Sequence, residues 1–315
     1  SHRVGVWATI LGRNLLRRDE TTMAGVFADN GYRTGIFGKW HLGDNYPFLP
    51  QYRGFQETII HGGGAISHGS DYWQNDYFDD TYYCNGVPRK FEGYCTDVFF
   101  DETIRFMEKN VGDLQPFFIY LPTNAPHIPY YVPDKYREMY EKKGLSEDFV
   151  RFYGMITNID ENVGKLLTRI GELGIENNTI VIFMTDNGNG LIVKDEKGKY
   201  YWPDQYNAGM RGSKCSEPIY EGGHRVPCFI RWPEKLKGGR DIQTLTAHID
   251  ILPTLIGMCG LKEKKKIKFD GMNLFPLLKE TDHENWPDRE IFIQYHQDDL
   301  PRKWDFAAVM TQRWR

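Results

Sequence analysis

Residues 179–188 read Thr-Ile-Val-Ile-Phe-Met-Thr-Asp-Asn-Gly. The first six residues are apolar or β-branched and do not alternate with polar ones, which is typical of a strand buried on both faces of a parallel sheet. Asp186 and Asn187 follow at the point where this strand is expected to end. The stretch therefore predicts a buried strand with two polar side chains at its carboxyl end, where ligands bind in open α/β sheets.

Working outward, short strand-like runs alternate with longer helical patterns. Further strands are expected at residues 34–37, 116–121 and 227–231. This alternation predicts an α/β fold in which a mostly parallel, mixed sheet is sandwiched by helices. The pattern changes at residues 289–315, which predict the start of a small C-terminal antiparallel subdomain. We therefore expect an α/β domain at residues 1–288.

The ends of three helices can be placed from capping residues. Thr21 or Thr22 is expected to cap a short helix that stops at Gly31, and Thr96 another that runs to about residue 110. The clearest helix starts after Ser146 and ends at residue 174. Two long stretches outside the helices, residues 44–96 and 188–225, are expected to be functional loops.

The composition is that of a globular enzyme, with 40% hydrophobic and 15% aromatic residues and a formal net charge of −4. This charge balance offers no diffuse basic surface for a nucleic acid. The dense basic run at residues 262–268 is short and interrupted, and we interpret it as an exposed loop. No stretch reaches the roughly 18 apolar residues of a membrane span. Oligomeric state is left open.

The cysteines match no zinc-finger spacing, and their odd number excludes complete pairing within one chain. Cys84 and Cys95 flank a loop that contains Gly and Pro, which is compatible with a disulfide or with two free thiols. The five cysteines are Cys84, Cys95, Cys215, Cys228 and Cys259.

Two segments place basic side chains directly after predicted strands. Lys39 and His41 lie two apart after residues 34–37, so on an extended segment both reach one anionic ligand, lysine with fixed charge and histidine with a proton. His127 follows residues 116–121 between Pro126 and Pro129, which restrict the backbone around the imidazole. The structural alternatives are a surface lysine beside a structural histidine, and an ordinary strand-to-loop turn.

Two further segments offer metal and anion ligands. The side-chain oxygens of Asp186 and Asn187 suit Ca²⁺ or Mg²⁺, although a complete site needs about six oxygens. Asn-Gly also marks hairpin turns, but the long loop that follows favours a metal site. Lys214 lies in a glycine-flanked loop and can clamp an anion, although most exposed lysines bind nothing specific.

These segments together resemble the sulfatase family of the alkaline phosphatase superfamily, over nearly the whole chain. The stretches that carry the resemblance are Gly-Tyr-Arg-Thr-Gly-Ile-Phe-Gly-Lys-Trp-His-Leu-Gly from Gly31, Asn-Ala-Pro-His-Ile-Pro from Asn124, Asn-Ile-Asp-Glu-Asn-Val-Gly from Asn158, Thr-Asp-Asn-Gly from Thr185, Glu-Gly-Gly-His-Arg-Val-Pro from Glu221, His-Ile-Asp-Ile-Leu-Pro-Thr from His248 and Phe-Asp-Gly-Met-Asn-Leu from Phe269.

The resemblance implies an alkaline phosphatase-like fold and a sulfuric ester hydrolase that acts on an aryl or carbohydrate sulfate ester. It implies a formylglycine nucleophile, made from Cys or Ser in a Cys/Ser-x-Pro-Ser-Arg segment, and Ca²⁺ as the cofactor, with Mg²⁺ as the alternative ion. Asp186 and Asn187 would then be two of the calcium ligands. A secreted, periplasmic or lysosomal location is also implied.

The resemblance also assigns roles to the basic residues. Lys39 and His41 would support the formylglycine, with Lys39 also contacting the sulfate. His127 would hold the ester and help to protonate the leaving alcohol, and Lys214 would be the second sulfate clamp. The resemblance thus implies that all four are catalytic residues and that Lys39, His127 and Lys214 also bind the substrate.

The sequence departs from the family pattern in three places. No Cys/Ser-x-Pro-Ser-Arg segment occurs, although the family has it shortly before the position of Ser1, and the earlier pair of metal-binding aspartates is absent. The interval between Lys214 and Glu221 is slightly longer than the family's common form. We therefore expect this chain to be an internal piece of a sulfatase that is inactive by itself.

Two other functions compete with this interpretation. One is a hydrolase of phosphate mono- or diesters or phosphonates from the same superfamily, which a Thr or Ser nucleophile without the formylglycine motif would favour. The other is a non-catalytic homologue that binds sulfated glycans and retains Lys39, His127 and Lys214 without turnover.

Overall fold

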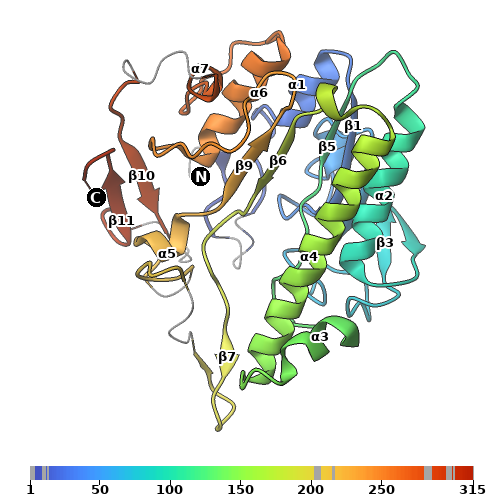
Figure 1. The fold of residues 1–315 in the computed structure, drawn as a ribbon, viewed down its shortest axis with the longest axis vertical. Coiled ribbons are helices and arrows are strands. Elements are labelled where there is room, and N and C mark those ends of the chain that lie inside the picture. Colours follow the sequence, from blue (N-terminus) through green and yellow to red (C-terminus); the bar gives the residue numbers. More distant parts are fainter. Residues whose placement is uncertain are drawn as a thin grey trace. The chain divides into compact units, whose positions relative to one another are not determined.

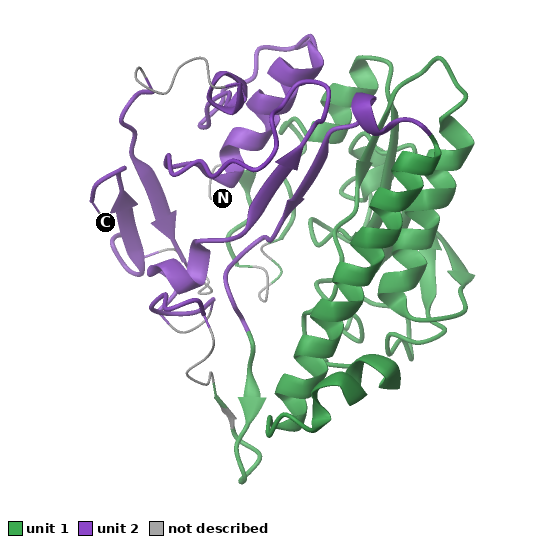
Figure 2. Ribbon diagram, in the orientation of Figure 1, with its two compact units in different colours: residues 1–173, 191–204 green, residues 174–190, 205–315 purple. Residues whose placement is uncertain are grey.

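The computed structural model describes residues 4–8, 12, 14–201, 207–214, 217–279, 286–295, 300 and 302–314. The chain divides into two compact units, which Figure 2 shows in different colours. Unit 1 comprises residues 1–173 and 191–204, and unit 2 comprises residues 174–190 and 205–315. The predicted boundary between the α/β domain at residues 1–288 and the C-terminal antiparallel subdomain at residues 289–315 stays a prediction.

Unit 1 contains the largest sheet of the described structure and its longest helices (Figure 1). Its helices and strands are α1 (Met23–Asp29), β1 (Arg33–Lys39), β2 (Glu57–His61), β3 (Thr81–Cys84), β4 (Val87–Lys90), α2 (Cys95–Asn110), β5 (Phe117–Tyr120), α3 (Asp134–Glu141), α4 (Glu147–Glu172), β7 (Val193–Lys194) and β8 (Tyr200–Tyr201).

The five-stranded sheet has the order β4-β3-β2-β1-β5. The central strand β1 pairs in parallel with β2 on one side and with β5 on the other, while β3 and β4 extend the sheet as antiparallel strands. Because β1, β2 and β5 run in the same direction, their carboxyl ends meet at one edge. Lys39 lies opposite His61 in the register there.

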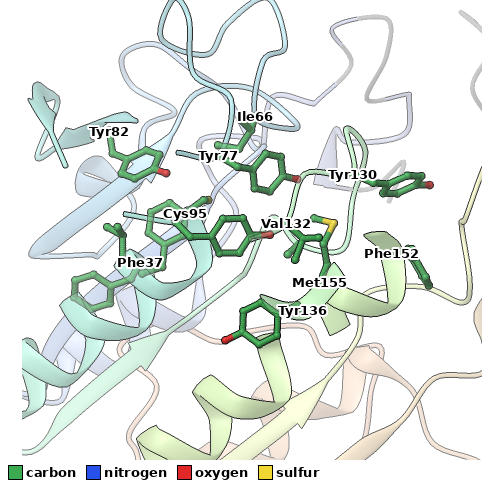
Figure 3. Close-up of a cluster of buried hydrophobic side chains, with 14 of the residues drawn as sticks. Phe37, Ile66, Tyr77, Tyr82, Cys95, Tyr130, Val132, Tyr136, Phe152 and Met155 are labelled. Carbon is green, nitrogen blue, oxygen red and sulfur yellow. The ribbon is translucent and has the colours of Figure 1, made fainter. Parts of the chain in front are cut away.

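Buried side chains cover both faces of this sheet. On one face, Phe37 packs in a cluster with Phe106 of α2 and Met155 of α4; Figure 3 shows Phe37 and Met155 in this cluster. On the other face, Ile36 packs in a cluster with Ala24 of α1. Neighbouring strand residues point to opposite faces, so consecutive Ile and Phe residues supply both clusters. The predicted α/β sandwich with a mixed sheet is confirmed.

The structure bears out two of the predicted helix ends and corrects a third. The Thr22 hydroxyl accepts a hydrogen bond from Gly25 N at 3.0 Å, which confirms the predicted cap of α1. Ser146 precedes α4, and Gly174, with φ 67°, follows its end as expected. The prediction for Thr96 is wrong: α2 starts one residue earlier, at Cys95, and Thr96 is fully buried in its first turn.

The predicted loop at residues 44–96 is wrong in part, because it contains β2, β3 and β4. The three strands are only four or five residues long, and glycine-rich segments separate them. Such short runs become recognisable as strands only when they pair with a neighbour. The second predicted loop, residues 188–225, likewise contains β7, β8 and one short helix.

Unit 2 consists of small sheets and short helices. Its elements are β6 (Val181–Met184), α5 (Glu221–His224), β9 (Cys228–Arg231), α6 (Ile251–Cys259), α7 (Phe275–Leu278), β10 (Ile291–Gln294) and β11 (Ala307–Met310). The antiparallel pair β10–β11 confirms the strands predicted for residues 289–315.

The strand predicted at residues 179–184 exists as β6, but its expected environment is wrong. It pairs with β9 in the antiparallel sense, and Phe183 is 37% exposed rather than buried. An unbroken apolar run indicates a strand, but it does not specify the neighbour or its direction.

The described cysteines Cys84, Cys95, Cys228 and Cys259 are free thiols, so Cys84 and Cys95 form no disulfide in this structure. Cys215 lies outside the described residues. Within the described ranges, none of the helices has the combination of length and hydrophobicity that crossing a bilayer requires.

Candidate active site

The carboxyl end of β1 carries the first two predicted site residues. Lys39 N donates a hydrogen bond to Pro122 O at 2.7 Å, which ties the end of β1 to the segment after β5. His41 has φ 53°, so the expectation that Lys39 and His41 lie on one extended segment is wrong. The ring of His41 instead lies against the backbone of Gly64. A non-glycine residue in the left-handed region is uncommon and often marks a functional position.

A buried histidine that the sequence did not single out, His61, lies within electrostatic range of the predicted basic residues. His61 is 1% exposed, its Nδ1 donates to Gly62 O at 2.9 Å, and its Nε2 has no hydrogen-bond partner. Its pKa is lowered to about 3, chiefly by burial and in part by the positive charges of Lys39, His41 and His127, while the hydrogen bond to Gly62 O opposes the shift. These three predicted residues therefore lie within electrostatic range of one neutral imidazole.

The carboxyl end of β5 leads to His127, whose ring and backbone are both held. Its Nδ1 donates to Ile128 O at 2.8 Å, so the neutral ring carries its proton on Nδ1 and a lone pair on Nε2. The Tyr77 hydroxyl donates to His127 O at 2.8 Å, and Asn124 Nδ2 donates to the Tyr77 oxygen. This network orients Nε2 for proton transfer.

A second histidine missed by the sequence interpretation, His68, lies beside His127. The two ring centroids are 6.0 Å apart and the rings are nearly perpendicular, at 81°. Partial burial lowers the pKa of His68, the charge of Lys39 lowers it further, and Asp71 raises it. His61 is the last residue of β2 and His68 lies in the loop after it, so recognising that strand would have pointed to both.

In unit 2 the predicted metal ligands follow β6. Asp186 is exposed, and no hydrogen bond or ion pair engages its carboxylate within the described residues. Asn187 Nδ2 donates to Gly188 O at 3.0 Å, which leaves its Oδ1 as an acceptor. The preceding turn is held by His248, whose Nε2 donates to Thr185 O at 2.8 Å.

The loop that carries Lys214 packs against the same turn. Lys214 N donates to Asn189 O at 2.8 Å. The aliphatic part of its side chain lies so close to Gly190 that a Cβ there would be 2.9 Å from Lys214 Cδ. Lys214 is therefore anchored on Asn189 and Gly190, which follow Asn187 by two and three residues in unit 2.

The donor chemistry of Asp186 and Asn187 fits a hard cation such as Ca²⁺, which prefers carboxylate and amide oxygens. Two residues supply fewer than the roughly six oxygens of a complete site. Among the described residues, no group of three or more His, Cys, Asp or Glu side chains could hold a metal ion. These two residues could therefore form only part of a calcium site.

The six predicted site residues form two groups. Lys39, His41 and His127 lie in unit 1, within electrostatic range of His61. Asp186, Asn187 and Lys214 lie in unit 2, where Lys214 N is hydrogen-bonded to Asn189 O. That all six share one pocket stays a prediction.

Comparison with known proteins identifies two family models. The one described as Sulfatase matches residues 1–261. The one described as N-sulphoglucosamine sulphohydrolase, C-terminal, matches residues 216–315.

Curated relatives match over most of this chain. The uncharacterized sulfatase YdeN of Escherichia coli K12 is 27% identical, over 95% of this chain and 58% of its own length. The ulvan-active sulfatase of Formosa agariphila is 29% identical, over 88% and 53%. Human N-acetylgalactosamine-6-sulfatase is 29% identical, over 90% and 51%. The chain thus spans between 51% and 58% of the length of these relatives.

Solved structures share the fold. The crystal structure of Ps i-CgsB in complex with k-i-k-neocarrahexaose has a TM-score of 0.76 at 27% identity, over 94% of this chain and 66% of that chain. The phosphonate monoester hydrolase of Agrobacterium radiobacter has a TM-score of 0.55 at 18% identity, over 89% and 66%, which shows a likeness of fold alone.

Proposed function

Because the chain belongs to the sulfatase family, we propose that the whole protein is a sulfuric ester hydrolase that cleaves carbohydrate sulfate esters. The observation that carries the proposal is the basic cluster of unit 1, in which Lys39 lies opposite His61 in the strand register and Lys39, His41 and His127 all act electrostatically on that buried imidazole. A carbohydrate rather than an aryl substrate is supported by the ulvan-active relative and by the structural neighbour that holds k-i-k-neocarrahexaose.

In this proposal the residues of unit 1 bind the ester and move one proton. The Lys39 ammonium group binds an anionic sulfate oxygen, and His41 is held in place by the Gly64 backbone. His127 donates its Nδ1 proton to Ile128 O, so its protonated ring presents Nε2–H to the leaving oxygen. His61 stays neutral, so it adds no positive charge to the cluster.

The residues of unit 2 would bind the cation and a further sulfate oxygen. We propose that Asp186 and Asn187 contribute oxygen ligands to Ca²⁺, which when bound supplies positive charge to the sulfate oxygens. Lys214, anchored on Asn189 and Gly190, is proposed as the second cationic side chain. The family's formylglycine would supply the attacking oxygen, and the sequence contains no Cys/Ser-x-Pro-Ser-Arg segment from which it is made.

No specific observation favours the phosphate or phosphonate alternative, since the likeness to the phosphonate hydrolase concerns the fold alone. The non-catalytic alternative differs from the proposal in one measurable respect: such a protein would bind a sulfated glycan without releasing sulfate. A secreted, periplasmic or lysosomal location, as the family resemblance implies, is part of the proposal.

The test is release of sulfate by the whole protein from sulfated sugars and aryl sulfates, with phosphate monoesters in parallel. We expect the whole protein to release sulfate from the sugars, and His127→Gln to lower kcat by about a hundredfold or more. Residues 1–315 alone should release no sulfate. Faster phosphate than sulfate release would overturn the proposal, and binding of a sulfated sugar without turnover would favour the non-catalytic alternative.

The metal assignment has its own test, because calcium binding can be measured by calorimetry without turnover. Asp186→Ala is expected to weaken Ca²⁺ binding and to lower sulfate release. Asp241→Ala, which removes another exposed carboxylate of unit 2, should change neither. If Asp186→Ala bound Ca²⁺ and turned over like the wild type, the assignment would be wrong.

A further inference from the structure

The imidazole of His68 is exposed, whereas that of His127 is half-buried, and the two rings meet edge to face with their centroids 6.0 Å apart. They come from different segments: His68 from the loop after β2, and His127 from the segment after β5. The proposed chemistry uses His127 and leaves His68 without a role.

Two residues of one buried cluster fix the positions of both histidines. Ile66 and Tyr77 are both fully buried in this cluster, where Figure 3 shows them. Ile66 lies two residues before His68 and anchors that loop, while the Tyr77 hydroxyl donates to His127 O. Both histidines are therefore attached to the same packed cluster, which reduces the conformational entropy lost when a ligand binds.

Polar contacts hold the rest of the loop. The Asp71 carboxylate accepts hydrogen bonds from Gly62 N at 3.1 Å, Ser67 N at 3.0 Å and Asn75 Nδ2 at 3.1 Å. Ser67 has φ 66°, and its hydroxyl donates to Asn75 O at 2.6 Å. The side chain of His68 therefore projects from an ordered turn.

The charges around His68 favour an anion. Lys39 and His127 are basic, and the neighbouring carboxylate, Asp71, is already engaged by three donors. In the proposed reaction Lys39, His127 and Lys214 bind the sulfate ester that is cleaved, and His68 is not needed for it. A further exposed imidazole next to Lys39 and His127 can donate to an anionic group beside that ester, and a bound anion would favour its protonated form.

We propose that His68 is a specificity-determining residue that binds a second anionic group, a sulfate or a carboxylate, adjacent to the sulfate ester being cleaved. This inference rests on the proposed function, and it narrows the substrate class to sugars that carry two neighbouring anionic groups. His68 binds and positions the substrate and takes no part in proton transfer.

The test compares two substrates of the whole protein, a monosulfated sugar and the same sugar with a second sulfate on a neighbouring position. His68→Ala should lower kcat/KM for the disulfated sugar by about tenfold or more, through KM, and leave the monosulfated sugar unchanged. His68→Asn, which keeps a donor, should restore part of the loss. Gly69→Ala, at a position with open space around it, should match the wild type.

Equal losses on both sugars, or no loss on either, would overturn the inference while leaving sulfatase activity intact. Calorimetric binding of the two sugars provides a measurement that does not need turnover. The wild type should bind the disulfated sugar more tightly, and His68→Ala should abolish that preference. If the wild type bound both sugars equally, the inference would be wrong whether or not sulfate is released.

Discussion

The imidazole ring of His41 lies directly on the backbone of Gly64. A Cβ atom at Gly64 would be 2.4 Å from His41 Cε1 and 2.6 Å from Nε2, which is closer than nonbonded atoms approach. Any side chain at residue 64 must therefore displace the His41 ring. The absence of a side chain at Gly64 thus allows the His41 ring to occupy its position.

Gly64→Ala should lower kcat of the whole protein by about a hundredfold, because shifting a site residue by about 1 Å costs that much. Substrate affinity should change less. Gly69→Ala lies in the same loop, where a Cβ meets nothing within 4 Å, and it should behave as the wild type. Histidine NMR signals should show His41 moving only in Gly64→Ala. Equal activity of the two variants would exclude this positioning role.

His61 should make the stability of the chain depend on pH. Its pKa falls from 6.5 to about 3 on folding, so between these values the unfolded chain binds more protons than the folded chain. The free energy of unfolding should therefore fall with decreasing pH across this window, by up to about 1.4 kcal/mol per pH unit. Denaturation of His61→Gln from pH 4 to 7 should show a shallower slope. Identical slopes would contradict the prediction.

Asp97 should stabilise the packing of α2 against α4 more than a neighbouring ion pair does. Its Oδ1 accepts 2.7 Å hydrogen bonds from the buried side chains of Asn158 and Asn162. Asp97→Ala removes the acceptor of Asn158 Nδ2 and one of the two acceptors of Asn162 Nδ2, which also donates to Asn158 O. We expect a loss of about 2–3 kcal/mol in the free energy of unfolding. Asp101, which pairs with exposed Lys165 across the same helices, is the matched control. Asp101→Ala should cost less than about 1 kcal/mol. Comparable losses in chemical denaturation would refute the distinction.

Asp250 and Arg289 should be a critical pair of unit 2. Asp250 is fully buried and accepts from Arg289 Nη1 at 2.9 Å, from Ala247 N at 2.7 Å and from Met272 N at 2.8 Å. Asp250→Ala leaves the guanidinium, itself only 10% exposed, without its counter-charge, so we expect a loss of about 3–5 kcal/mol.

The control for this pair is Glu176→Ala. It breaks an ion pair with Arg231 in which both side chains are more than 40% exposed. Water solvates both charges there, so the loss should stay below about 1 kcal/mol. A thermal or chemical unfolding curve of Asp250→Ala that overlays this control would show that the buried pair is dispensable.

The strands at residues 34–37 and 116–121 and helix α4 were predictable, because hydrophobic periodicity and capping depend on residues close in the chain. β3 and β4 were missed because each is only four residues long, although the Asn-Gly pair between them is a local hairpin signal. β2 lies in the stretch predicted as a loop, so the sequence pattern does not single out His61 and His68.

For the candidate site, too, local sequence motifs and tertiary contacts supply different information. The sequence by itself indicated which side chains we propose for the chemistry, since Lys39, His41, His127, Asp186, Asn187 and Lys214 stand in motifs that are local in the chain. Only the tertiary structure decided which of them meet. The register of β1 on β2 sets Lys39 opposite His61, and the buried Tyr77 and Ile66 hold His127 and His68 side by side. Such contacts join residues distant in sequence, and no local pattern encodes the burial that brings them together.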